Sequence, residues 1–218
     1  MRKRFREHGA DNFHDHELLE MMLYQCYPRC DTNPIAHKIL REFGSLQNLF
    51  ETNPDAIKKR LNCSENVAVY LSLISGVTKR YLSSKWKEKP TLSGHEIAGE
   101  YAISLFFGEQ VECFYVLCLD KQNRLNRAVK AASGTIDEVS IFVREIVRHV
   151  MENHAAYVIL AHNHPGGTTL PSHEDRMLTT QIKDALKVVH VEVVDHIVVG
   201  GEKYYSFARR KDPQVVGY

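Results

Sequence analysis

The sequence predicts a small all-α domain followed by an α/β domain, and three observations support this. Apolar residues recur at helical spacing from residue 15 to residue 82, with no strand-like run between them. A polar, lysine-rich stretch follows. After it, short apolar runs typical of buried strands are mixed with amphipathic helical segments, without strict strand–helix alternation. We therefore expect a helical domain over residues 1–82, a linker over 83–92 and a sheet-and-helix domain over 93–218.

Proline and glycine residues mark where helices begin and end in the helical region. In Asn33-Pro34 and Asn53-Pro54 the proline stands at a first helical position, and Gly44 follows a helix end with Ser45 as the next cap. The expected helices span residues 15–25, 34–43, 45–51, 54–61 and 64–82.

The second part mixes both kinds of element. Apolar periodicity predicts helices over residues 93–107, 141–153 and 172–187. It predicts strands over residues 112–120, 125–132, 155–161, 191–199 and 204–208. The expected fold class is α/β, with a sheet sandwiched by helices on its faces.

Composition narrows the class of protein. With 218 residues, 44% apolar residues and a net charge of +1, the chain has one or two globular domains. No apolar run is long enough for a membrane helix and the N-terminus lacks a signal-peptide segment, so we expect a cytoplasmic protein. The five cysteines include no Cys-x-x-Cys pair, so neither a disulfide framework nor a thiolate zinc knuckle is indicated.

Two histidines stand at the end of a predicted strand. The apolar run 155–161 leads into His162 and His164, and the Pro-Gly-Gly at residues 165–167 must end the strand. Side chains two residues apart in a strand point the same way, so both imidazoles can approach one ion. Asn163 between them points elsewhere.

A carboxylate completes a metal-binding pattern. Asp175 lies at the start of the helix expected over 172–187, from where it could fold back onto the strand end. Two imidazoles and one carboxylate are the ligand pattern of a catalytic zinc, which leaves the fourth position for water. Zinc lowers the pKa of that water to about 7, but a nearby base must still take and return its proton.

Each of these residues also has a simpler interpretation. Ser172 and Asp175 fit a capping box at a helix N-terminus, and two histidines in a Pro-Gly loop could be exposed to solvent. The combined spacing favours the metal site over these separate interpretations.

The same residues resemble the signature of the RadC family, bacterial members of the JAMM (MPN-plus) metallopeptidases. The family pattern is His-x-His, seven residues, Ser, two residues, Asp, and His162, His164, Ser172 and Asp175 have this spacing. Gly166 stands where family members commonly have serine. Similarity continues over nearly all of residues 92–209, including 133–136, 143–147 and 194–200, and implies the cytidine-deaminase-like architecture of JAMM domains.

The resemblance also implies an upstream glutamate at the start of a strand. Glu112 opens the run 112–120 and is assigned as the base, with Glu109 as the fallback. Asp195 and His196 flank another strand, where we expect them to support the fold or to hold the metal ligands in place, and not to bind the metal themselves.

The resemblance implies a role for each site residue. His162, His164 and Asp175 would hold Zn²⁺, Glu112 would deprotonate the bound water, and Ser172 would donate to the oxyanion. The implied function is a zinc metallopeptidase or isopeptidase, a hydrolase that cleaves an amide bond of a protein or peptide.

Residues 1–82 resemble the helix-hairpin-helix domain that precedes the peptidase domain in RadC proteins, notably in segments 6–10, 17–19 and 42–46. Such units offer backbone N–H groups of a Gly-x-Gly turn to a DNA phosphate. The turn here, residues 62–66, has no glycine and adds Glu65, so we expect at most a weak DNA contact, to which Lys58, Lys59 and Arg60 would contribute.

Two other functions stay open at this stage. The chain could be a DNA-associated module, linked to repair or cutting phosphodiesters, although its His-Asn-His string resembles the HNH nucleases in letters only. A noncatalytic scaffold would predict a missing ligand or base, and none is missing. The residues leave open the substrate, the oligomeric state and whether iron or manganese competes with zinc.

Overall fold

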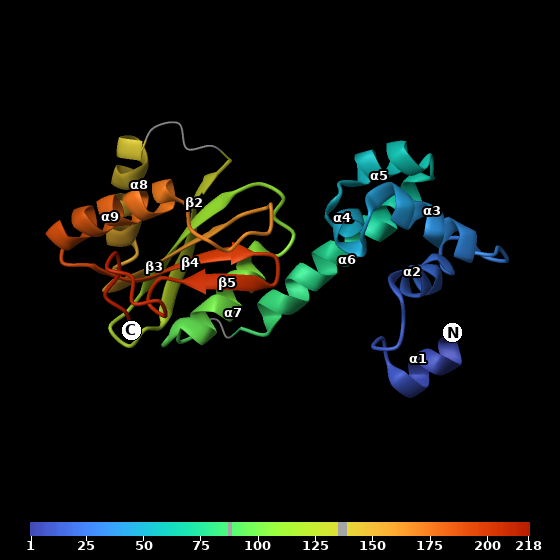
Figure 1. Ribbon diagram of the computed structural model, residues 1–218, viewed down its shortest axis with the longest axis horizontal. Coiled ribbons are helices and arrows are strands. Elements are labelled where there is room, and N and C mark those ends of the chain that lie inside the picture. Colours follow the sequence, from blue (N-terminus) through green and yellow to red (C-terminus); the bar gives the residue numbers. More distant parts are fainter. Residues whose placement is uncertain (87–88, 135–138) are drawn as a thin grey trace. The chain divides into compact units, whose positions relative to one another are not determined.

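The computed structural model describes residues 1–86, 89–134 and 139–218 (Figure 1). Lys87 and Glu88 of the expected linker lie outside these residues, as do Thr135 and Ile136 of the segment 133–136. The chain divides into two compact units, Met1–Arg80 and Tyr81–Tyr218, which are described separately.

The first unit is helical. Its helices are α1 (Arg2–His8), α2 (Asp15–Leu23), α3 (Asn33–Phe43), α4 (Leu46–Glu51), α5 (Pro54–Leu61) and α6 (Glu65–Ser84), the last of which ends beyond the unit boundary. The apolar faces of α2 to α6 share one core, whose centre includes Leu19, Ile39, Leu49 and Leu71. The side chain of Ser45 caps α4, as predicted, and α5 begins at Pro54, as predicted, with the side chain of Asn53 as its cap.

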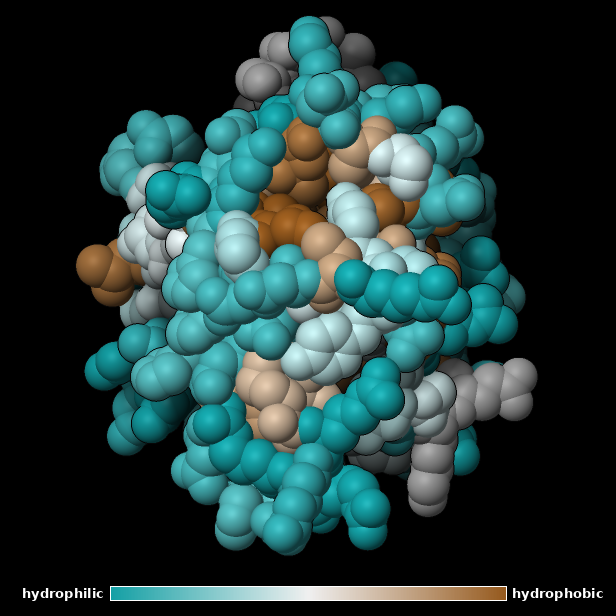
Figure 2. Space-filling model, turned by 90° about the vertical axis from the view of Figure 1, so that its right-hand side faces the viewer, coloured by the Kyte–Doolittle hydropathy of each residue, from teal (hydrophilic) through white to brown (hydrophobic). Residues whose placement is uncertain are grey.

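Two features of this unit differ from the predicted pattern. Helix α1 was not expected, because its seven residues are mostly charged and none of them is buried. Helix α6 runs to Ser84, two residues into the expected linker, and exposes Val69, Leu73 and Val77 along one side. Figure 2 shows a face of the molecule on which hydrophilic side chains predominate, with hydrophobic ones gathered in patches between them.

The second unit is built on a five-stranded sheet of order β2-β1-β3-β4-β5. The elements are α7 (His95–Phe106), β1 (Cys113–Leu119), β2 (Leu125–Ser133), α8 (Val139–Glu152), β3 (Tyr157–Asn163), α9 (His173–Val188), β4 (Glu192–Gly200) and β5 (Lys203–Ser206). Strands β3 and β4 are parallel, and the other neighbours are antiparallel.

Each face of the sheet has its own core. Along β1, Val116 and Cys118 pack with α8 and α9, whereas Leu117 and Leu119 pack with α7. Figure 1 shows α8 and α9 on one side of the sheet and α7 on the other. This layered arrangement confirms the predicted α/β class.

The end of the expected linker is part of the sheet unit. Leu92 is fully buried, its N–H donates to Asn123 O at 2.8 Å, and Leu125 N–H donates to Pro90 O at 2.8 Å. Among the described residues, no helix is long and apolar enough to cross a membrane.

Candidate metal centre

The end of β3 presents two imidazoles to one point. His162 is buried and His164 is half-buried just beyond the strand, where its N–H donates to Val199 O of the parallel neighbour β4 at 2.8 Å. The two Nε2 atoms lie 3.0 Å apart. The alternation of side chains along a strand therefore produces the shared direction that the spacing predicts.

Asp175 reaches this point from the first turn of α9. Its Oδ1 lies 3.3 Å from His162 Nε2, and its Oδ2 lies 3.5 Å from His164 Nε2. Ligand atoms held at about 2.0–2.1 Å from a tetrahedral zinc lie roughly 3.3 Å apart. The spacing of these three side chains thus fits a zinc ion.

Glu112 comes to the same point because of strand pairing. It immediately precedes β1, and β1 pairs with β3 so that Phe114 is opposite His162. One ligand atom from each of Glu112, His162, His164 and Asp175 lies within 4.8 Å of the others, and no other such group occurs among the described residues.

Hydrogen bonds at Nδ1 determine which nitrogen of His164 faces the metal position. His164 Nδ1 lies 3.1 Å from Thr168 O, and a carbonyl oxygen can only accept, so Nδ1 carries the proton. The Nε2 lone pair is left for a metal ion.

A series of linked hydrogen bonds orients His162. Its Nδ1 lies 2.8 Å from His196 Nε2, and His196 Nδ1 lies 2.6 Å from Thr179 Oγ1. Since the Thr179 hydroxyl donates to Asp175 O at 2.5 Å, His196 must donate to Thr179 and accept from His162. His162 is thereby left with an unprotonated Nε2, the state that a metal ligand needs.

Burial and hydrogen bonding determine the protonation states of His196 and Asp175 in this series. His196 is fully buried, and burial lowers its pKa well below the usual range, so its ring stays neutral at neutral pH. Burial of Asp175 opposes its ionisation. When the His162 ring is protonated, its hydrogen bond to the carboxylate and its charge, together with the N–H of Ser172, outweigh burial and hold the pKa of Asp175 well below the usual range.

Ser172 forms the capping box of the simpler interpretation. Its Oγ accepts from Asp175 N at 3.0 Å, and its N–H donates to Asp175 Oδ2 at 2.7 Å. The box orients the carboxylate, with Oδ2 held at the helix end and Oδ1 turned toward His162. Because the Oγ acts as an acceptor in the cap, its own proton can still be donated elsewhere.

Comparison with known proteins places the chain in a family. Residues 92–212, more than half of the chain and all four clustered side chains, match the RadC-like JAB domain. The chain belongs to the RadC family. UPF0758 proteins are similar along almost the whole RadC chain: one from Vibrio cholerae is 36% identical over 209 residues, 96% of this chain and 93% of the relative. One from Vibrio vulnificus is 34% identical over 209 residues, which again cover 96% of this chain and 93% of the relative. One from Rhodobacter capsulatus is 33% identical over 207 residues, which cover 95% of this chain and 97% of the relative.

Residues outside the RadC signature complete the site. Thr179 lies four residues after Asp175 on α9, and this helical spacing could have linked the two, but its contact with His196 depends on how α9 packs on β4. Asp195 points away from the metal position and accepts hydrogen bonds from Ser206 Oγ at 2.7 Å and Tyr218 OH at 3.2 Å. The fallback base, Glu109, binds Lys130 at 3.1 Å and is not in the four-residue cluster.

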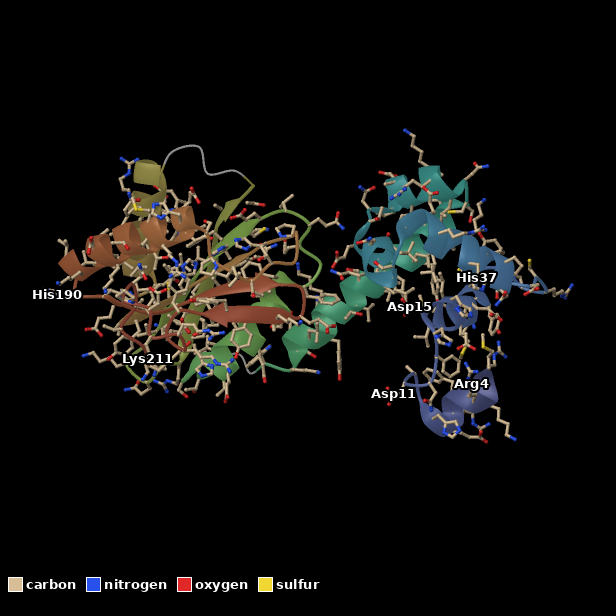
Figure 3. The ribbon with its side chains drawn as sticks, in the orientation of Figure 1. Arg4, Asp11, Asp15, His37, His190 and Lys211 are labelled. Carbon is tan, nitrogen blue, oxygen red and sulfur yellow. The ribbon has the colours of Figure 1, made fainter. Side chains whose placement is uncertain are left out.

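Two other features of this RadC chain lie away from the cluster. A cavity of about 620 Å³, lined in part by Asp120, His154 and His190, lies at the opposite ends of β1 and β3 from Glu112 and His162. Among the described residues that line this cavity, no set of ligand atoms is comparable to that of the cluster. His16 stacks on His37 in the helical unit, with ring centroids 4.4 Å apart, and Figure 3 shows the positions of His37 and His190.

Proposed function

We propose that this chain is a zinc-dependent metallopeptidase or isopeptidase that hydrolyses an amide bond. The observation that carries the proposal is the pair of Nε2 atoms 3.0 Å apart, each on a ring whose Nδ1 already has a protein acceptor. Together with the Asp175 carboxylate they form a three-ligand set, and such sets leave one coordination position for chemistry.

The donor set favours zinc and hydrolysis. His162, His164 and Asp175 would hold the ion, and a bound zinc would lower the pKa of coordinated water to about 7. All five cysteines are free thiols, and none of them belongs to the cluster, so its donors are nitrogen and oxygen atoms.

Glu112 is assigned the proton transfers. Glu112 is exposed, and one of its carboxylate oxygens lies within 4.8 Å of a ligand atom of each of the other three side chains, close enough to reach a water molecule held by the metal. In this position it can accept a proton from the attacking water and pass it to the leaving amine.

Ser172 is assigned the oxyanion. It stands at the N-terminus of α9 with its hydroxyl proton available, next to Asp175. Donation to the developing negative charge would stabilise the transition state, and loss of one such donor costs about 3 kcal/mol in comparable sites.

The test compares the zinc-loaded protein with Glu112→Gln on a denatured bacterial proteome, with new N-termini and released lysine conjugates identified by mass spectrometry. We expect cleavage by the parent chain and by the control Glu174→Gln, an exposed carboxylate in the first turn of α9. Glu112→Gln should retain zinc by elemental analysis and lose cleavage. Equal cleavage by Glu112→Gln, or zinc-loaded parent protein without cleavage, would overturn the proposal.

A further inference from the structure

Asn163, the residue between the two histidines, faces the opposite way from them and contacts the backbone on both sides of Glu112. Its Oδ1 accepts from Cys113 N–H at 2.7 Å, and its Nδ2 donates to Val111 O at 3.1 Å. We propose that Asn163 is a positioning residue that holds Glu112 in place as the base, an inference that rests on the proposed function.

The contact continues the strand pairing by one residue. Strands β1 and β3 pair from Phe114 opposite His162 onward, and Asn163 comes next on β3. A side-chain amide offers an acceptor and a donor as a peptide group does. Asn163 thus pairs with residues 111 and 113 where the antiparallel ladder ends.

A second contact restrains the other side of the same segment. Gly134 N–H donates to Glu112 O at 2.7 Å, from the turn after β2. Backbone groups of three successive residues, Val111 to Cys113, are therefore bonded to neighbouring segments. The part of this segment left to act on a substrate is the Glu112 side chain, which is exposed.

The two hydrogen bonds from the Asn163 side chain to Val111 and Cys113, here called the clamp, are shielded from water. Asn163 is 5% exposed and Cys113 is 1% exposed, so water has little access to these hydrogen bonds if the amide is removed. His162, Asn163 and His164 are consecutive. One short segment therefore carries two metal ligands and, through the clamp of Asn163, also fixes the backbone that carries the base, Glu112. This would set the separation between metal and base, on which proton transfer depends.

The experiment measures the binding of acetohydroxamic acid to the zinc-loaded protein by calorimetry. The hydroxamate binds zinc, and a glutamate beside the metal can accept its proton, so its affinity reports on the position of Glu112 without any peptide substrate. The variants are Asn163→Ala, Glu112→Gln and the double variant. Asn126→Ala is the matched control, since Asn126 also donates to a backbone carbonyl, Asn153 O at 3.3 Å, outside the cluster.

We expect Asn163→Ala and Glu112→Gln each to weaken hydroxamate binding by roughly tenfold, as expected for losing a hydrogen bond to a charged group. The double variant should bind no more weakly than Glu112→Gln alone, because both changes act on one interaction. Zinc affinity should stay within about threefold of the parent value. A purely structural role for Asn163 would instead give additive losses.

Additive losses, unchanged hydroxamate binding by Asn163→Ala, or loss of zinc along with hydroxamate would overturn the inference. If Asn163→Ala does not fold, Asn163→Asp serves in its place, because it keeps an acceptor for Cys113 N–H and removes the donor to Val111 O. A parent protein that binds neither zinc nor hydroxamate would refute the proposed function itself. A parent protein that binds both, with variants that behave as the parent, would refute only the role of Asn163.

Discussion

The Nδ1 atoms of the two clustered histidines are bonded to different partners, Thr168 O for His164 and the His196 ring for His162. The first bond is local, across four residues. The second depends on Thr179 of α9 and on Asp175 O, so the helix that supplies the carboxylate ligand also orients one of the imidazoles. Such outer partners commonly matter almost as much as the ligands themselves.

Thr179→Val should therefore weaken zinc binding by about 10–100-fold, because His196 loses its acceptor and no longer fixes the His162 ring. Zinc affinity measured by chelator competition checks this. Thr180→Val is the control, since Thr180 makes the same kind of bond, to Arg176 O at 3.0 Å, on the exposed side of α9. Equal affinities for the two variants would show that the chain of hydrogen bonds does not act on the metal.

At this scale the sequence predicted part of the site. The direction of His162 and His164 follows from strand alternation, and the capping box of Ser172 and Asp175 follows from local spacing. The hydrogen bonds of Thr179 and Asn163 join segments distant in sequence, and their formation depends on register and helix packing that no local pattern specifies.

At the scale of elements, the loop after β3 rests against the end of β4. A Cβ atom on Gly200 would lie 2.5 Å from Gly167 O and 2.6 Å from Thr168 O, closer than packed atoms can approach. Glycine at this position thus allows the loop to close and brings Thr168 O to His164.

Gly200→Ala should move this loop, destabilise the fold by about 1–3 kcal/mol and weaken zinc binding. Urea denaturation and zinc titration measure the two effects. Gly166→Ala in the same loop is the control, because a Cβ there meets nothing within 4 Å and the backbone is not at positive φ. If Gly200→Ala bound zinc as tightly as Gly166→Ala, the loop would not determine the position of His164.

The predicted elements agree with the structure in order and type for all the strands expected after residue 93, with ends displaced by at most two residues. Periodicity detects elements that bury one face, which is why α1, with no buried residue, was missed. Leu92 was assigned to the linker because the polar residues before it dominate the local composition, although its side chain packs in the core on the α7 side of the sheet.

At the scale of the whole molecule, the metal cluster lies entirely in the second unit, and the helical unit has its own core. We therefore expect zinc to stabilise one unit only. Calorimetry should show the unfolding of residues 81–218 shifted by zinc, by about 2.7 kcal/mol at a free concentration of 100 Kd, with the helical unit unchanged. A shift of both transitions would contradict separate folding.

The helical unit should bind DNA only weakly. The turn after α5 has Asn62 in the left-handed conformation, and Ser64 Oγ accepts from Val67 N at 3.4 Å at the start of α6. Lys58 is paired with Glu65 at 3.4 Å, and Arg60 is paired with Glu42 at 3.1 Å. These contacts place carboxylates beside the basic residues and use part of the helix N-terminus that would otherwise attract a phosphate.

Fluorescence anisotropy with a labelled duplex at physiological salt measures this directly. We expect affinity no tighter than nonspecific binding, with Kd about 10⁻⁴–10⁻⁶ M, and little change in Lys59→Ala. Nanomolar binding that Lys59→Ala abolishes would show that the unit is a DNA-binding domain despite its glycine-free turn.

The central claim is that His162, His164 and Asp175 hold one zinc ion with an open position facing Glu112. Anomalous diffraction at the zinc edge from crystals of the zinc-loaded protein tests it most directly. We expect one strong peak about 2.0–2.1 Å from each Nε2 and from an Asp175 oxygen, with the Glu112 carboxylate facing the remaining position. A peak elsewhere, a fourth protein ligand, or Glu112 turned away from the ion would contradict it.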